Sequence, residues 1–251
     1  MDFELPQELT EYLRELDEFI AREIKPLEER DDNIRFFDHR REDARTDWER
    51  GGLPSEEWEA LLAEAVRLAD AAGHYRYAFP REYGGRDGTN LGMAVIREHF
   101  AEQGLGLHND LQNEHSIVAN NVGLMLMLAY GDEQQKSDWV ECLADGTKFF
   151  AFGITEPAHG SDATHMETTA QRDGDEWVIT GEKTWNTGIH KASHDLIFTR
   201  TSGEAGDADG ITAFLVPTKV SGFKVEEMLW TFNMPTDHGH VSFADVRVGH
   251  D

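Results

Sequence analysis

The sequence is poor in cysteine and lysine, and it has no long apolar segment. Cys142 is the single cysteine among 251 residues, so no disulfide can form within the chain. Because Leu143 and Ala144 follow it in a helical pattern, we expect a small buried side chain rather than a nucleophile. No run reaches the roughly 18 apolar residues of a membrane-spanning helix, and the first residues lack a secretory signal. These absences predict a cytoplasmic protein without a membrane partner.

The charge balance is strongly acidic. Aspartate and glutamate number 49 against 23 arginines and lysines, of which only seven are lysines, giving a net charge of −26. This charge repels nucleic acid and anionic membranes, and no basic patch compensates for it, so we expect no nucleic-acid partner. Simple solubility would explain the excess of carboxylates. We favour adaptation to a salt-rich cytosol, because lysine is scarce where aspartate and glutamate fill most surface-like positions.

The first half of the chain has a helical period. Apolar residues recur at intervals of three and four from about residue 7, and this pattern predicts a helix that closes or kinks near Pro26. A second helix is expected from Ser55 as its N-cap to Gly73, and others near 90–103 and 116–130. A last helix should begin after Asp132 and end at Gly146. The charge-dense residues 30–50 predict a solvated loop or helix end.

After Gly146 the period changes to two. Short β-rich runs at 148–155, 168–172, 176–180, 183–187, 196–201, 211–217, 223–227 and 241–248 predict strands. Residues 173–175 (DGD) predict a hairpin turn between two of them. We therefore predict an α+β protein, with an all-helical N-terminal domain over residues 1–146 and a barrel-like β-sheet domain over residues 147–251.

Two segments of the β half combine small, aromatic and hydroxyl side chains. The segment 152–162 (FGITEPAHGSD) ends a strand in a loop that allows close backbone approach to a flat polar ligand. Trp185 and Thr187 are two apart on a strand and should share one face, where they can pack on a ring and hydrogen-bond one of its heteroatoms. The pattern alone favours the ordinary alternative, in which Trp185 is a core residue and Thr187 a residue of the sheet ladder.

These segments carry a family resemblance. TEPAHGSD at 155–162, followed by DEWVITGEKTWNTG at 175–188, resembles the acyl-CoA dehydrogenase family, whose flavin loop reads TEPxxGSD and whose next strands read GxKxW(I/S)(T/S). FPREYGG at 79–85, GDEQQKSDWVECLADG at 131–146 and VSFADVRV at 241–248 also look like family segments. The resemblance covers the chain from about residue 55 to its end.

The resemblance implies an FAD site and a role for each matched residue. The positions implied to contact FAD are Phe152, Ile154, Thr155, Ser161, Trp185, Asn186 and Thr187. Ser161 would also lie near the CoA end of the substrate, and the Thr187 hydroxyl would face flavin N5. Asn186 stands where the family commonly has Ile or Ser, and His159 also departs from its pattern. We expect Glu156 to brace the loop rather than to act as a base.

The resemblance also implies a reaction and its partners. Family members oxidise an acyl-CoA thioester between Cα and Cβ, pass hydride to FAD and reduce an electron-transfer flavoprotein, and we expect a homodimer or homotetramer. The family's C-terminal four-helix domain, with the catalytic Glu, would be absent from these 251 residues. We therefore assign no catalytic residue here and expect this chain alone to be inactive. An acyl-CoA oxidase, a flavin monooxygenase of the same fold, and a non-catalytic flavin-binding fragment stay open as alternatives.

Histidines near the end of the chain raise the question of a metal. His238 and His240 are spaced to share a strand face, with Asp237, His190 and His194 as possible further ligands. Zinc sites usually bring three or four ligands at characteristic spacing, and this region has no second cluster of that kind. We expect ordinary hydrogen-bonded histidines and no metal site.

The acidic surface predicts that salt stabilises the protein. Raising KCl to about 1 M shortens the Debye length to about 3 Å and screens repulsion among the 26 net negative charges. We expect the melting temperature, followed by circular dichroism, to rise between dilute buffer and molar KCl. A melting temperature that stays flat or falls would contradict the salt-adapted interpretation.

Overall fold

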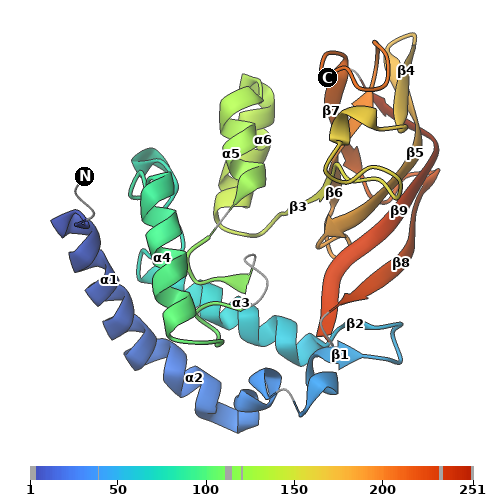
Figure 1. Ribbon diagram of the computed structural model, residues 1–251. Helices are drawn as coiled ribbons and strands as arrows, with labels where there is room; N and C mark the ends of the chain where they lie inside the picture. The colour runs from blue at the N-terminus through green and yellow to red at the C-terminus, as the bar shows by residue number, and fades with distance from the viewer. Residues whose placement is uncertain (1–3, 39, 111–114, 120, 232–233, 250–251) are drawn as a thin grey trace. The chain divides into compact units, whose positions relative to one another are not determined.

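The computed structural model describes residues 4–38, 40–110, 115–119, 121–231 and 234–249. The chain divides into two compact units (Figure 1). One consists of Met1–Arg45 and Ser55–Asp145 and is helical; the other consists of Thr46–Pro54 and Gly146–Asp251 and holds the sheet. The predicted α+β class, helices first and sheet second, is confirmed. The sequence did not predict that Thr46–Pro54 joins the sheet unit, and the division into domains 1–146 and 147–251 stays a prediction.

The first helix continues through Pro26, where the sequence predicted its end or a kink. Helix α1 (Gln7–Phe19) passes into a π-helical turn (Ile20–Ile24) and then into α2 (Lys25–Glu29). The Lys25 N–H bonds to the Ile20 carbonyl five residues back, so the hydrogen-bond pattern has already widened to that of a π turn just before Pro26, which has no N–H to contribute. The wider π turn therefore lets the helix pass a proline without breaking.

The remaining helices of this unit follow the predicted caps. They are α3 (Glu56–Ala71), α4 (Asn90–Glu102), α5 (Val122–Tyr130) and α6 (Glu133–Ala144). Ser55 caps α3 through its hydroxyl, and Asp132 and Gln135 form a capping box at α6. Helix α5 begins six residues later than expected at Val122, after the N-cap Asn121. Cys142 is only half-buried, with Sγ directed to the Asp138 carbonyl.

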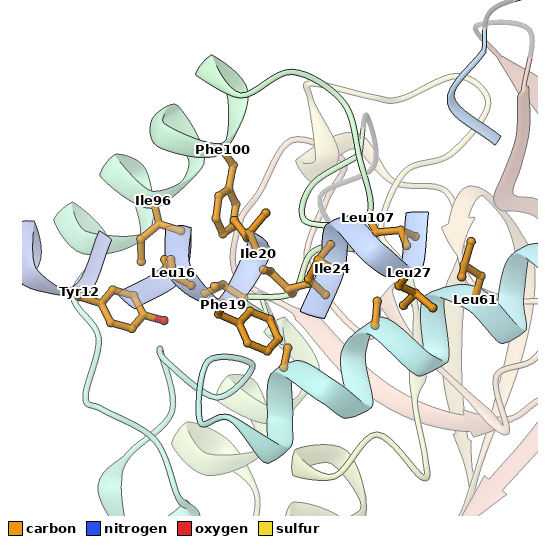
Figure 2. Packing of buried hydrophobic residues seen from close by; sticks show 14 of the residues in the cluster. Tyr12, Leu16, Phe19, Ile20, Ile24, Leu27, Leu61, Ile96, Phe100 and Leu107 are labelled. Carbon is orange, nitrogen blue, oxygen red and sulfur yellow. The ribbon is translucent and has the colours of Figure 1, made fainter. Parts of the chain in front are cut away.

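The apolar stripes of α1, α2, α3 and α4 meet in one core. Figure 2 shows side chains of α1 and the π turn packing against those of α3 and α4. Its labelled members are Tyr12, Leu16, Phe19, Ile20, Ile24, Leu27, Leu61, Ile96, Phe100 and Leu107. Each fully buried aliphatic or aromatic side chain contributes roughly 1.5–3 kcal/mol by leaving water. Among the described residues, no helix is long and apolar enough to cross a membrane.

The prediction of a solvated loop over residues 30–50 is wrong for part of this segment. It forms 3₁₀ turns at Arg30–Phe37 and Glu42–Arg45, and Phe36 and Arg45 are buried. Arg45 donates from Nη1 to Asp110 Oδ2 at 2.7 Å and from Nε to the Phe36 carbonyl at 2.6 Å, and its guanidinium lies 4.3 Å from the Trp58 ring centre. A paired and stacked arginine can be buried, so charge density alone misled the sequence interpretation.

The second unit is a curled sheet with a small hairpin, β1 (Thr46–Asp47) and β2 (Leu53–Pro54) (Figure 1). The strands of the sheet are β3 (Phe150–Gly153), β4 (Thr169–Asp173), β5 (Glu176–Thr187), β6 (His194–Arg200), β7 (Ile211–Pro217), β8 (Phe223–Thr231) and β9 (Met234–Gly249). Their order is β3-β6-β4-β5-β9-β8, with β7 paired to β6. Only β3 and β4 run parallel to β6; the other ladders are antiparallel.

Two of the predicted strands form a single continuous strand in the structure. Residues 176–180 and 183–187 both belong to β5, and Gly181, which the pattern treated as a break, lies at a register shift against β9. A Cβ at Gly181 would lie 2.5 Å from Thr168 Oγ1, and its φ is 144°, so this position requires glycine. The predicted DGD hairpin is confirmed, because Asp173 pairs with Glu176 across the turn.

Candidate functional site

The loop that follows β3 is packed tightly against the end of β5. A Cβ on Gly153 would lie 2.5 Å from Asn186 Nδ2 and 2.9 Å from Ile197 Cγ2. Beyond Gly153, the Thr184 N–H donates to the Thr155 carbonyl at 2.9 Å, and Lys183 Nζ donates to the Ile154 carbonyl at 3.2 Å. The sheet thus places two predicted site residues, Ile154 and Thr155, beside the strand that carries three others.

Glu156 fixes this loop from inside the sheet unit. Its carboxylate is 4% exposed and accepts hydrogen bonds from Lys183 Nζ at 2.7 Å, Thr168 N at 2.9 Å and Glu167 N at 2.6 Å. Burial raises the pKa of Glu156, but the bonds from Lys183, Thr168 and the backbone outweigh it and hold that pKa below its usual value. Burial is also the main cause that lowers the pKa of Lys183. With these donors in place, Glu156 acts as the expected brace.

Strand β5 presents Trp185 through a bulge. Thr184 is paired with His240 and Asn186 with Gly239, so Trp185 is an extra residue opposite β9. Trp185 has a φ of 67°, a conformation that costs a non-glycine residue about 1–3 kcal/mol and is common at functional sites. Its indole is 45% exposed and meets the His238 ring edge-on at 6.3 Å. The bulge holds a large aromatic surface toward solvent on a rigid strand.

The neighbours of Trp185 alternate in burial. Asn186 is fully buried and donates from Nδ2 to Asp195 Oδ2 at 2.5 Å, whereas Thr187 is only partly buried. The structure therefore leaves Trp185 exposed and Thr187 partly exposed on either side of a buried Asn186, and the bulge at Trp185 interrupts the strict alternation from which a shared face was expected. Since the Asn186 side chain lies inside the unit, only its backbone can take part in a surface site.

The other predicted residues occupy the same loop and strand. Phe152 is half-buried on β3, with its ring centre 5.3 Å from that of Phe198 on β6. Ser161 is exposed in the loop, after the turn in which Glu156 and His159 exchange backbone hydrogen bonds. Sequence reasoning missed Asp195, because an aspartate before an apolar run gives no sign that it is wholly buried.

The Glu156–Lys183 pair predicts a large cost for removing one partner. Lys183→Met would leave a buried carboxylate without its cation, so we expect the free energy of unfolding to fall by about 3–5 kcal/mol in urea titrations. Lys224→Met is the matched control, since Lys224 pairs with Glu226 on the surface of the same unit and should change little. Adding Glu156→Gln to Lys183→Met should recover part of the loss. Equal losses for Lys183→Met and Lys224→Met would contradict this account of the brace.

Comparison with known proteins matches both units. A family model described as the acyl-CoA dehydrogenase N-terminal domain covers residues 6–147, and the model for the middle domain covers residues 151–246. The human short-chain specific acyl-CoA dehydrogenase of mitochondria is 32% identical over 192 residues, 75% of this chain and 45% of that protein. The glutaryl-CoA dehydrogenase of Desulfococcus multivorans is 29% identical over 253 residues, 99% of this chain and 57% of that protein.

Solved structures show the same relationship. A putative acyl-CoA dehydrogenase from Mycobacterium abscessus matches with a TM-score of 0.76 and 29% identity, over 98% of this chain and 60% of that one. A glutaryl-CoA dehydrogenase from Mycobacterium smegmatis in complex with FADH2 matches with a TM-score of 0.66 and 25% identity, over 98% and 54%. The chain spans about half the length of the curated relatives it matches. With both family models matched in order along nearly its whole length, the chain belongs to the acyl-CoA dehydrogenase family.

Proposed function

We propose that this chain forms the FAD-facing part of an acyl-CoA dehydrogenase. The observation that carries the proposal is the backbone bond from Thr184 to Thr155, which holds the loop beside the bulged, exposed Trp185 and the accessible Thr187. The relative solved with FADH2 adds support from outside the chain. The site fits a flavin because it combines an exposed aromatic face, a hydroxyl and loop backbone on a rigid support.

Each predicted site residue then has a physical task. The Trp185 indole supplies a flat surface for the isoalloxazine ring, and the Thr187 hydroxyl supplies a hydrogen bond at N5. Ile154 and Thr155 would help to hold the ring through the loop, and Phe152 and Ser161 would extend the site along it. Asn186 contributes through its backbone. Bound FAD would supply the redox chemistry, accepting hydride from the Cβ of an acyl-CoA thioester.

The proton at the substrate Cα needs a base on the side away from the flavin. Glu156 does not serve, because its oxygens are engaged by Lys183, Thr168 and Glu167 inside the unit. We propose that a carboxylate outside these 251 residues supplies the base. The electron acceptor we propose is an electron-transfer flavoprotein, and the functional assembly we propose is a homodimer or homotetramer.

Flavin binding should depend on Trp185. We expect Trp185→Ala to weaken FAD binding by about 3- to 10-fold, corresponding to roughly 0.5–1.5 kcal/mol of ring stacking. Trp48→Ala is the control, because Trp48 is 55% exposed in the same unit and packs on Trp230 instead. Titration of FAD followed by flavin fluorescence measures both. Absence of FAD binding, or equal losses in the two variants, would count against the proposed site.

Because the proposed base lies outside these 251 residues, we predict that this chain does not dehydrogenate acyl-CoA by itself. Anaerobic mixing of the FAD-loaded protein with a panel of acyl-CoA thioesters should leave the oxidised flavin band unbleached at enzymatic rates, since only the flavin side of the reaction is present. Rapid bleaching would place a base within these residues. Reoxidation in air would then separate a dehydrogenase, which reoxidises slowly, from an oxidase, which reoxidises fast.

A further inference from the structure

A second polar pair lies inside the sheet unit, directly behind the candidate flavin site. Asn186 on β5 and Asp195 on β6 are both 0% exposed, and Asn186 Nδ2 lies 2.5 Å from Asp195 Oδ2. In the sheet order, β4 separates β5 from β6. This side-chain bond therefore joins two strands that are not ladder neighbours.

The pair leaves two acceptor atoms open. Asn186 Oδ1 and Asp195 Oδ1 are both buried, and neither has a hydrogen-bond partner among the described residues. An ionised Asp195 would hold a buried charge with a single amide donor, which is costly. A protonated carboxyl can instead donate its O–H to an amide oxygen while it accepts from the amide N–H. One proton on Asp195 would thus provide a donor for the open oxygen of Asn186.

The surroundings of Asp195 favour its protonated form. Across the ladders, Asp195 is paired with Ala151 on β3 and Val216 on β7, both apolar. Lys183 attracts Asp195, but its ammonium already bonds Glu156, and Asp237 on β9 is a further buried carboxylate in this unit. Burial raises the pKa of Asp195 to about 7, against the opposing effects of Asn186 and Lys183.

Asn186 connects this pair to the surface site. It stands between Trp185, with its φ of 67°, and Thr187, and its amide packs against Gly153 at the start of the loop. We propose that Asp195, held as a neutral acid, is a positioning residue: it fixes Asn186, and through Asn186 the Trp185–Thr187 segment. The last step, presentation of this segment to the flavin, rests on the proposed function; the protonation of Asp195 does not.

The first experiment needs no flavin. Because the folded pKa is about 7 and the ordinary value is 3.8, the folded protein keeps a proton that the unfolded chain has lost between about pH 4 and 7. The ratio of the wild-type unfolding constant to that of Asp195→Asn should therefore rise by up to about tenfold per pH unit between these pH values. Above pH 7 the ratio should level off. Asp175→Asn, a substitution in the exposed hairpin turn that keeps Asp195, should show the same rise relative to Asp195→Asn as the wild type does. A constant ratio from pH 4 to 8 would overturn the proposal.

The second experiment measures FAD affinity between pH 6 and 8.5. Wild type and Asp195→Asn should agree within about twofold at pH 6, because an amide can replace the neutral acid in the pair. As the pH rises, the wild type should weaken, by up to about tenfold per unit, while Asp195→Asn loses this dependence. His238, whose ring meets that of Trp185 edge-on, is retained in both proteins, so it does not distinguish them.

The outcomes separate the two proposals. Equal pH dependence in wild type and Asp195→Asn would overturn the positioning role, because a residue that only stabilises the fold would not move the affinity profile. Failure of the wild type to bind FAD at any pH would overturn the proposed function and with it the positioning role, while the unfolding experiment would still decide whether Asp195 is protonated.

Discussion

The candidate site depends on one buried ion pair, between Glu156 and Lys183. Glu156 lies in the loop after β3, and its carboxylate joins this loop to the residues just before β4 and to the middle of β5, because its donors are Glu167 N, Thr168 N and Lys183 Nζ. Burying both charges is costly, and their attraction repays this cost only when the remaining hydrogen-bonding atoms are also served. Here the N–H groups of Glu167 and Thr168 donate to the carboxylate, and the Ile154 carbonyl accepts from the Lys183 ammonium. The pair is therefore better understood as fixing geometry than as adding stability.

The helical unit uses buried charge in the same way. Glu28 is 4% exposed, binds Lys25 at 2.8 Å and accepts the Leu107 N–H at 2.7 Å, so it ties α2 to the segment after α4. Arg45 does likewise with Asp110. In both cases a buried charged side chain also satisfies a backbone group, the Leu107 N–H for Glu28 and the Phe36 carbonyl for Arg45. Buried charged side chains thus hold the loops in place, whereas apolar stripes drive the packing of the helices.

Much of the fold could be predicted from periodicity and caps. The N-caps Ser55 and Asp132, the change of period at Gly146 and the positions of most strands followed from local rules, because each depends on residues close in sequence. The π turn before Pro26 did not follow from these rules, and neither did the buried Arg45 or the fusion of two strands into β5, the last two of which depend on contacts with distant residues. Local patterns carry no information about such partners.

The candidate site likewise combines features that the sequence could predict with features that it could not. Spacing predicted that Trp185 and Thr187 share one face of a regular strand; the structure leaves both at least partly accessible around a buried Asn186, but through a bulge that breaks the alternation. The bulge that turns Trp185 outward could not be predicted, since it arises from the pairing of β5 with β9. Nor could the partner of Asn186, which lies nine residues away on β6. An apolar residue at 186 would need no partner, so the amide and Asp195 make sense only together. The polar pair couples the interior of the sheet to the strained Trp185 on its surface. A purely apolar contact could provide the same coupling, but that coupling would not depend on protonation.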